Sequence, residues 1–319
     1  MEWILLVIGF LLLIKGADFF VDGASSMAEK LNVSPMVVGL TIVAFGTSAP
    51  EAVVSIIAAL DGNGDMVLGN IIGSNIVNIT LLLGITAMVS TLVIERQTST
   101  RELPYSLIAA GLLLILMSDA ILFSSPTNVV GRVDGIILLA GIVLFIFYIL
   151  IKTKRSKHLK EARSEEDSQN MSWPKSIVLF TLGLLGIIFG GEMVVSNASS
   201  IAISLGMSQA LVGLTIVAIG TSLHELVTSI TAALKGEASI AIGNIVGSNI
   251  FNIFFVAGLA ATIEPLNVSG NFLVDGWILI GATVLLLVLA LWRKKLTKIE
   301  GVILIVFYVV YLVYIILRG

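Results

Sequence analysis

The sequence contains no cysteine and little charge, since only 12% of its 319 residues are Asp, Glu, Lys or Arg. Without cysteine it cannot form disulfides, thiolate metal sites or iron–sulfur clusters, although this absence does not fix the compartment. The net charge of −3 and the lack of a long basic run give no indication of nucleic-acid binding. Hydrophobic residues make up 57% of the chain, and its mean hydropathy is +1.06. So little charge cannot cover the surface of a soluble domain of this size, so the composition predicts an integral membrane protein.

Long apolar runs separated by short polar breaks predict ten membrane-spanning helices, since each span needs roughly 20 apolar residues. The expected spans are residues 3–22, 34–60, 66–93, 104–122, 130–152, 174–196, 208–234, 239–263, 272–292 and 299–317. A hydrophilic segment, 154–173, separates a first unit of five spans from a second. The expected fold is therefore an all-α membrane protein with ten transmembrane helices, divided into residues 1–153, a linker 154–173, and residues 174–319. The N-terminus lacks a basic region and a small-residue cleavage site, which predicts a retained first span rather than a signal peptide.

The distribution of basic residues predicts the orientation. If the N-terminus lies outside, 15 of the 18 Lys and Arg residues fall in the inner connections, including the linker. This asymmetry follows the positive-inside rule. We therefore expect a multi-pass protein of the cell membrane, with both termini outside and the linker 154–173 in the cytoplasm.

The chain contains an internal repeat at one fixed offset. Residues 38–79 align without gaps with residues 212–253, 174 positions later, and 27 of the 42 positions are identical. The identities include Gly, Thr, Ser, Asn and Glu in register, which hydrophobic composition alone does not produce. Because five spans is an odd number, the second unit enters the membrane with the opposite orientation. Inverted repeats of this kind are typical of secondary transporters, whose substrate site lies near the midplane between the copies; the alternative is a duplicated scaffold with no transport role.

Each repeat places one glutamate midway along an apolar segment, Glu51 in the first and Glu225 in the second. An ionised carboxylate at that depth costs at least ~2.5–3.5 kcal/mol, so it must meet a cation, a proton or water. Neither residue has a Lys or Arg nearby in sequence that would form a structural ion pair, which is the alternative interpretation. We interpret both as cation ligands.

The residues before each glutamate predict a break in the helix. The segments GTSAPE (46–51) and GTSLHE (220–225) place glycine and hydroxyl side chains where a continuous helix is expected, and Pro50 removes a backbone donor. Carbonyl groups freed by such a break are tolerated at this depth only where they face a cavity. The alternative is a simple kink relieved by the Ser and Thr side chains, which is compatible with a ligand role.

A polar stripe follows each break, with Asn, Ser and Asn at intervals of four residues, which place them on one helix face. For Asn70 and Asn244, near the helix starts, we favour a structural hydrogen bond. The deeper side chains are predicted cation ligands: Ser74, Asn78, Ser248 and Asn252.

Two carboxylates surrounded by hydroxyl, amide and carbonyl oxygens suit Ca2+, which takes 6–8 oxygen ligands in a flexible geometry. The two charges balance one divalent ion. Without Ca2+, they require Na+ or protons to remain in a medium of low dielectric constant. An empty binding site therefore resists the change that opens it to the other side of the membrane, and this resistance is the physical basis of exchange. A channel, by contrast, needs weaker ligands and a continuous pore.

These motifs resemble those of the calcium/cation antiporter superfamily, specifically its prokaryotic sodium/calcium exchanger branch. The resemblance lies in GTSAPE with GSNIVN and in GTSLHE with GSNIFN. It implies a secondary antiporter, not an enzyme, that exchanges Ca2+ for Na+ by alternating access without a cofactor, with spans one and six sliding across the bundle. It also implies a set of side-chain and carbonyl ligands: Glu51, Glu225, Ser48, Ser222, Thr47, Thr221, Ser74, Ser248, Asn78, Asn252, Ala44 and Ala218.

Two residues depart from the family pattern. His224 replaces the usual proline, which leaves open the shape of the second helix break and the choice of coupling ion. Asn252 stands where several relatives have aspartate, an acid that potassium-dependent members need, so potassium cotransport is not expected.

Other classes of protein fit the sequence less well. The pair His224-Glu225 begins a zinc-protease pattern, but the fourth residue after the histidine is Thr228 and the only other histidine is His158. No phosphate-binding glycine–lysine loop exists for an ATP-driven pump. The partners that we expect are Ca2+, Na+ and the lipid bilayer, with no nucleic acid, no ATP and no obligate protein partner. A Ca2+/H+ antiporter of the same fold remains the alternative, although the Gly-Thr-Ser before each glutamate favours sodium.

Overall fold

The computed structural model describes residues 1–122, 126–160, 171–207 and 218–318, without the side chains of 152–160, 218 and 219. Nearly all of these residues are helical. Among them, eight helices are long and apolar enough to cross a membrane, and a bent helix pair gives a ninth candidate. The first part of the expected span 208–234 lies outside the described residues.

The helices of the N-terminal part are α1 (Glu2–Leu31), α2 (Pro35–Val38), η1 (Gly39–Val43), α3 (Ala44–Thr47), α4 (Ala49–Leu60), α5 (Gly64–Val77), η2 (Asn78–Leu82), α6 (Leu83–Val89), η3 (Thr98–Glu102), α7 (Leu103–Leu116), α8 (Asp119–Leu122) and α9 (Arg132–Lys160). The helices of the C-terminal part are α10 (Trp173–Ser204), α12 (Ala218–Thr221), α13 (Leu223–Leu234), α14 (Ala238–Phe251), η5 (Asn252–Ala257), α15 (Gly258–Ile263), α16 (Gly270–Arg293) and α17 (Lys298–Arg318). The η elements are π-helical turns within longer helices.

The repeat seen in the sequence is also present in the boundaries of the elements. Helices α3, α4 and α5 begin and end 174 residues before α12, α13 and α14, respectively. The two-residue strands β1 (Leu92–Val93) and β3 (Leu266–Asn267) show the same offset. β1 pairs antiparallel with β4 (Lys295–Leu296), and β3 pairs antiparallel with β2 (Val129–Val130). The identical motifs therefore fold into the same local structure twice.

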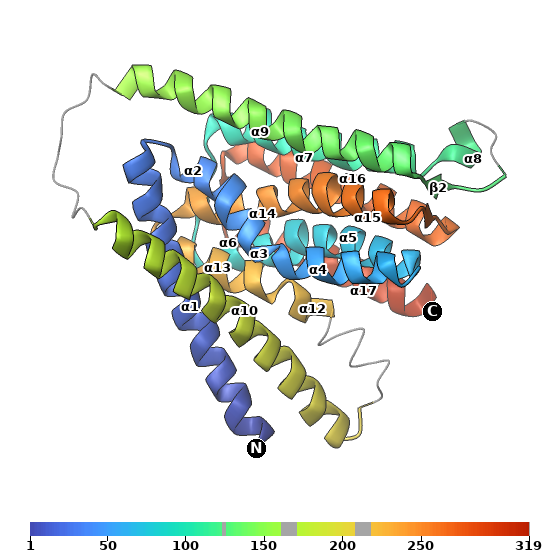
Figure 1. Cartoon of the computed structure of the whole chain (residues 1–319), viewed down its shortest axis with the longest axis horizontal. Coiled ribbons are helices and arrows are strands. Elements are labelled where there is room, and N and C mark those ends of the chain that lie inside the picture. The colour runs from blue at the N-terminus through green and yellow to red at the C-terminus, as the bar shows by residue number, and fades with distance from the viewer. Residues whose placement is uncertain (123–125, 161–170, 208–217, 319) are drawn as a thin grey trace.

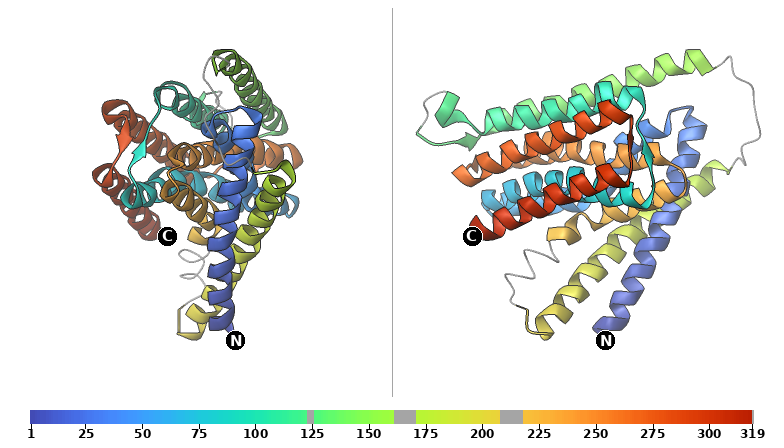
Figure 2. Two further views of the ribbon diagram at one scale, coloured as in Figure 1. Left: turned by 90° about the vertical axis from the view of Figure 1, so that its left-hand side faces the viewer. Right: turned by 180° about the vertical axis from the view of Figure 1, so that it is seen from behind.

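Helices α1 and α10 form a close pair that crosses the other helices obliquely, and their ends project from the bundle (Figures 1 and 2). Glycines bring the two backbones together. A Cβ atom on Gly16 would lie 2.7 Å from the Gly186 carbonyl carbon, and one on Gly190 would lie 2.5 Å from the Leu13 amide nitrogen. Small residues at such a contact permit the close approach that stabilises helix pairs in lipid.

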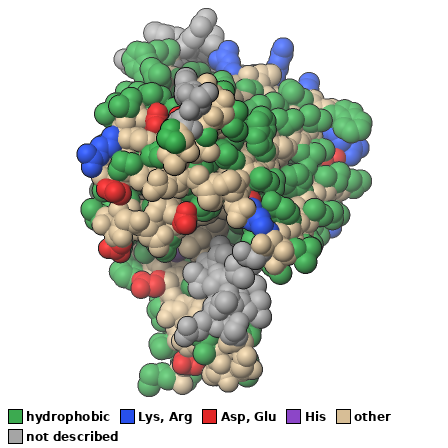
Figure 3. Space-filling model, turned by 90° about the vertical axis from the view of Figure 1, so that its right-hand side faces the viewer, with side chains coloured by type: hydrophobic (Ala, Val, Ile, Leu, Met, Phe, Trp, Pro, Cys, Tyr) green, Lys and Arg blue, Asp and Glu red, His purple; other side chains and the backbone are tan. Residues whose placement is uncertain are grey.

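The two polar-stripe segments, α5–η2–α6 and α14–η5–α15, lie inside the bundle. In the most apolar stretch of the first segment 78% of the residues are buried, and in that of the second segment 94% are buried. On the face shown in Figure 3, hydrophobic side chains cover large areas and charged side chains are scattered. The polar groups that carry the chemistry are thus enclosed by apolar helices.

Several boundaries differ from those expected from hydropathy. α1 continues nine residues beyond the expected end of its span and stops at Asn32, whose φ of 52° is left-handed. α10 continues through Asn197, which donates its side-chain amide to the Met193 carbonyl, and ends at Ser204. α9 continues to Lys160, so the first residues of the expected linker are helical. The expected span 104–122 is wrong at its end, because α7 stops at Leu116 and a separate short helix, α8, follows.

Candidate cation site

Both expected helix breaks occur directly before the glutamates. Ser48 separates α3 from α4 with φ −89° and ψ 5°, and Ser222 separates α12 from α13 with φ −93° and ψ 10°. At the first break the chain bends by 47°. His224 occupies the position that Pro50 has in the first copy, yet both helices restart at equivalent residues. The proline is therefore not required for this geometry, because the first turn of a helix tolerates proline without needing it.

Glu51 and Glu225 lie in the first turns of α4 and α13, where the helix N-terminus stabilises negative charge. Their exposed fractions are only 1% and 0%. The two carboxylates are close enough to interact electrostatically. Among the described residues, no Lys or Arg forms an ion pair with either of them. Two buried negative charges without a basic partner need positive charge from elsewhere.

Several polar atoms around these carboxylates have no hydrogen-bond partner within the described part of the chain. They are Oε1 and Oε2 of Glu51, Oε2 of Glu225, Oγ of Ser222 and Ser248, Oδ1 and Nδ2 of Asn78, and Oδ1 of Asn252. Buried polar atoms are normally paired, because an unpaired one costs roughly 1–3 kcal/mol. Nearly all of these atoms are oxygens with free lone pairs, the donor set that hard cations prefer. Six of the predicted ligand residues thus carry buried polar atoms without a hydrogen-bond partner among the described residues.

Hydrogen bonds between the two units connect most of the remaining predicted side chains. The Ser48 hydroxyl donates to Glu225 Oε1 at 3.0 Å, and the Asn252 amide donates to the Ser74 hydroxyl at 3.2 Å. The Thr47 hydroxyl donates to Asn244 Oδ1 at 2.9 Å. These bonds therefore join residues of the two repeats that are far apart in the sequence.

The prediction that the first asparagine of each stripe is structural is confirmed. The Asn70 amide donates to the Glu51 carbonyl at 3.2 Å and to the Ser55 hydroxyl at 2.9 Å. The Asn244 amide makes the same two bonds in the second copy, to the Glu225 carbonyl at 3.4 Å and the Ser229 hydroxyl at 3.0 Å. These bonds hold the first turn of each glutamate-bearing helix against its stripe helix.

The predicted carbonyl ligands are less clearly placed. The Ala44 carbonyl accepts hydrogen bonds from the Ser48 amide at 3.0 Å and from the Thr47 hydroxyl at 3.4 Å, so it is not free in this conformation. His224 Nδ1 lies 3.3 Å from the Thr221 carbonyl oxygen, to which it donates when protonated. Ala218 begins α12, and its side chain lies outside the described residues. The ligand role of these carbonyls stays a prediction.

Two features of the site were not anticipated from the sequence. The π-helical turns η2 and η5 begin at Asn78 and Asn252, so each predicted ligand lies where the helix widens. Such turns are frequent at functional sites, but no local residue pattern predicts them. The Asn249 amide also donates to the Asn75 carbonyl at 3.2 Å. Asn75 and Asn249 occupy the same position in the two repeated motifs, and this identity in the sequence could have indicated a role for them.

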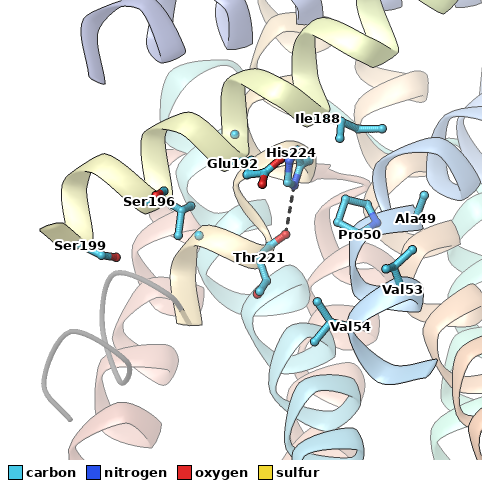
Figure 4. Close-up of a pocket in the computed structure, with 13 residues that line it drawn as sticks. Ala49, Pro50, Val53, Val54, Ile188, Glu192, Ser196, Ser199, Thr221 and His224 are labelled. Atoms are coloured by element: carbon cyan, nitrogen blue, oxygen red, sulfur yellow. Dashed lines mark hydrogen bonds between the residues drawn. The ribbon is translucent and has the colours of Figure 1, made fainter. Parts of the chain in front are cut away.

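A cavity of about 590 Å³ reaches the helix breaks from the face between α4, α10 and α12 (Figure 4). Pro50 and His224, the residues next to the two glutamates, lie on its wall. Glu192 and Ser196 of α10 also line it, and both are exposed. The rest of the lining is mostly apolar.

Comparisons with known proteins agree with this geometry. The family described as sodium/calcium exchanger protein matches residues 1–154 and 175–317. The chain is 40% identical to the putative antiporter CaxA of Alkalimonas amylolytica, over 97% of this chain and 96% of that protein. It is 32% identical to the sodium/calcium exchanger MaX1 of Methanosarcina acetivorans, over 98% and 97% of the two chains. A solved structure of the sodium-calcium exchanger NCX_Mj, soaked with zero Na+ and Ca2+, superposes with a TM-score of 0.82 at 29% identity, covering 98% of both chains.

Proposed function

Because the chain belongs to the sodium/calcium exchanger protein family, we propose that it is a secondary active antiporter that exchanges Ca2+ for Na+ across the cell membrane by alternating access. The observation that carries this proposal is the convergence of unpartnered oxygens on Glu51 and Glu225. Two carboxylates balance one Ca2+, and the same two charges require Na+ when Ca2+ is absent.

The proposed binding set contains the side chains predicted from the sequence, with carbonyl oxygens at the helix breaks. Its members are Glu51, Glu225, Ser48, Ser222, Thr47, Thr221, Ser74, Ser248, Asn78, Asn252, Ala44 and Ala218. The backbone carbonyl groups at the C-terminal ends of α3 and α12 carry partial negative charge near the site, including those that accept hydrogen bonds. The helix breaks thus contribute electrostatically even where a given carbonyl is not a direct ligand.

The proposed architecture has ten spans in two inverted units, residues 1–153 and 174–319, joined by a cytoplasmic linker 154–173, with both termini outside. The repeated element boundaries support it. The proposed moving part is the α1–α10 pair, which crosses the other helices obliquely (Figure 1). Its movement would open the site to one side of the membrane and close it to the other.

Equilibrium binding to the purified protein tests the site without requiring transport. We expect Ca2+ to bind and Na+ to displace it, while K+ at equal ionic strength does not. Glu225→Gln should abolish this binding, whereas Glu29→Gln, which changes an exposed acid at the end of α1, should leave it unchanged. Binding of Ca2+ that is insensitive to Na+ but sensitive to pH would instead favour a Ca2+/H+ antiporter.

A further inference from the structure

A cluster of charged side chains ties α1 to the turn between α13 and α14. Lys235 Nζ lies 2.7 Å from Asp22 Oδ1 and 3.4 Å from Asp18 Oδ1, and it donates to the Asp18 carbonyl at 2.9 Å. Next to it, the Ser25 hydroxyl donates to Glu237 Oε1 at 2.7 Å. We call these five residues the Lys235 clasp. Asp18, Asp22 and Ser25 lie on one face of α1, because their spacing is three to four residues.

The clasp connects the oblique helix pair to the part of the bundle that carries Glu225. On one side of the clasp is α1, a member of the oblique α1–α10 pair. On the other side is the turn that follows α13, the helix whose first turn carries Glu225. Movement of α1 relative to this helix therefore has to break the clasp. The clasp lies toward the end of α1 that is near the start of α10, since Lys30 packs over the Trp173 ring at 5.8 Å. This is the linker side of the molecule.

Among the described residues, the repeat places no equivalent clasp on the opposite side. At the 174-residue offset, Lys235 corresponds to Asp61, so the turn after α4 has an acid where the clasp has its only base. The α1 residues of the clasp correspond to three residues of α10, namely Glu192, Ser196 and Ser199. All three line the 590 Å³ cavity instead of contacting a turn (Figure 4). One copy of the interface is thus closed by ion pairs, whereas the corresponding side chains of the other copy line a cavity among the described residues.

We propose that the Lys235 clasp is a gate that holds the protein closed on the linker side, and that opening toward that side requires the clasp to break. This inference rests on the proposed function only in that an antiporter alternates between two conformations. The strength of the clasp suits that role. Its side chains are partly exposed, at 28% for Lys235 and 46% for Asp22, so solvent and salt weaken the attraction. A fully buried network would resist the opening that each transport cycle requires.

The absence of cysteine permits a direct test with single reporter cysteines in the purified full-length protein. Val21 is 1% exposed and lies on the clasp face of α1, so Val21→Cys reports opening on the linker side. Ser196→Cys reports the opposite cavity. We expect Lys235→Met to speed thiol modification of Val21→Cys by roughly 3- to 10-fold and to slow that of Ser196→Cys. The reason is that the conformation open on the linker side becomes more populated, and the conformation open on the opposite side becomes less populated.

The matched control is Lys15→Met. Lys15 pairs with Asp18 at 3.4 Å within α1, so this change removes a charge from the same cluster without breaking a contact to the turn. We expect it to leave both modification rates within about twofold of the parent. Exchanging the charges, in Lys235→Asp with Asp22→Lys, restores only the pair between positions 22 and 235 and should bring both rates part of the way back to those of the parent.

Three results would overturn the gate: unchanged reporter rates in Lys235→Met, an equal effect of Lys15→Met, or faster modification of Val21→Cys without slower modification of Ser196→Cys. The last pattern would indicate local fraying of α1. These measurements require no ion flux, so a parent protein that fails to exchange Ca2+ for Na+ contradicts the proposed function and leaves the clasp comparison intact.

Discussion

The hydroxyl of Ser48 donates a 3.0 Å hydrogen bond to Oε1 of Glu225, so the first helix break reaches the carboxylate of the second repeat. The corresponding atoms of the other copy, the Ser222 hydroxyl and the Glu51 carboxylate, have no hydrogen-bond partner among the described residues. The two repeats therefore share one site but do not contribute to it identically in this conformation. Glu51 is the carboxylate with both oxygens available to a cation.

Neutralising either carboxylate should abolish calcium exchange. Glu51→Gln and Glu225→Gln each remove half of the charge that balances a divalent ion, while a glutamine of the same shape keeps the packing. We expect sodium-driven Ca2+ flux to fall by at least about 100-fold, which corresponds to about 2.7 kcal/mol. Flux in vesicles, with Glu29→Gln as the control, measures the effect. Near-normal flux in a glutamine variant would remove that residue from the binding set.

The two structural asparagines should differ in their contribution to stability. Asn244 is 0% exposed and makes three hydrogen bonds, whereas Asn70 is half-buried and makes two. Asn244→Ala leaves buried partners unsatisfied, so we expect a loss of roughly 1–3 kcal/mol, against roughly 0.5–1.5 kcal/mol for Asn70→Ala. Thermal unfolding in detergent gives the comparison. An equal or reversed order would show that these bonds do not hold the stripe helices.

His224→Pro should keep its exchange activity. As the second residue of α13, His224 has a backbone amide that no intrahelical carbonyl accepts, and proline at this position of α4 supports an equivalent break. We expect flux within roughly threefold of the parent and a superimposable pH profile. A shifted profile would show that the imidazole senses pH next to the site. A tenfold loss of flux would show that the side chain itself is needed.

Calcium transport should not require potassium. Asn78 and Asn252 are neutral and lie at equivalent positions of the two π-helical turns, so Glu51 and Glu225 are the two acids of the proposed binding set. A monovalent ion beside Ca2+ would leave uncompensated positive charge in a medium of low dielectric constant. Asn252→Asp adds a third carboxylate, which should recruit an extra cation or hold a proton. Ca2+ flux with and without K+, in parent and variant, tests this charge count, and a parent that depends on K+ would contradict it.

The sequence predicted the two helix breaks and the stripe residues because both depend on local patterns that occur twice. Proline and hydroxyl residues mark the breaks, and spacing of four marks the shared helix face. Asn70 and Asn244 were also assigned correctly, since their position near the helix starts indicated a structural role.

Other features depend on tertiary contacts that no local pattern encodes. α10 extends past Asn197 to Ser204, so this polar residue does not end the helix. The contact of Lys235 with α1 joins elements that are far apart in the sequence, and the π-helical turns begin at Asn78 and Asn252 without a local sequence signal. In the linear sequence, Lys235 and Asp22 are only scattered charges 213 residues apart.

The most direct test of the account is Ca2+ flux in proteoliposomes loaded with Ca2+, driven by a Na+ gradient or by a proton gradient applied separately. The account predicts rapid Ca2+ movement with the Na+ gradient, loss of that movement in Glu51→Gln and Glu225→Gln, and no stimulation by the proton gradient. Flux driven by protons and indifferent to Na+ would contradict it.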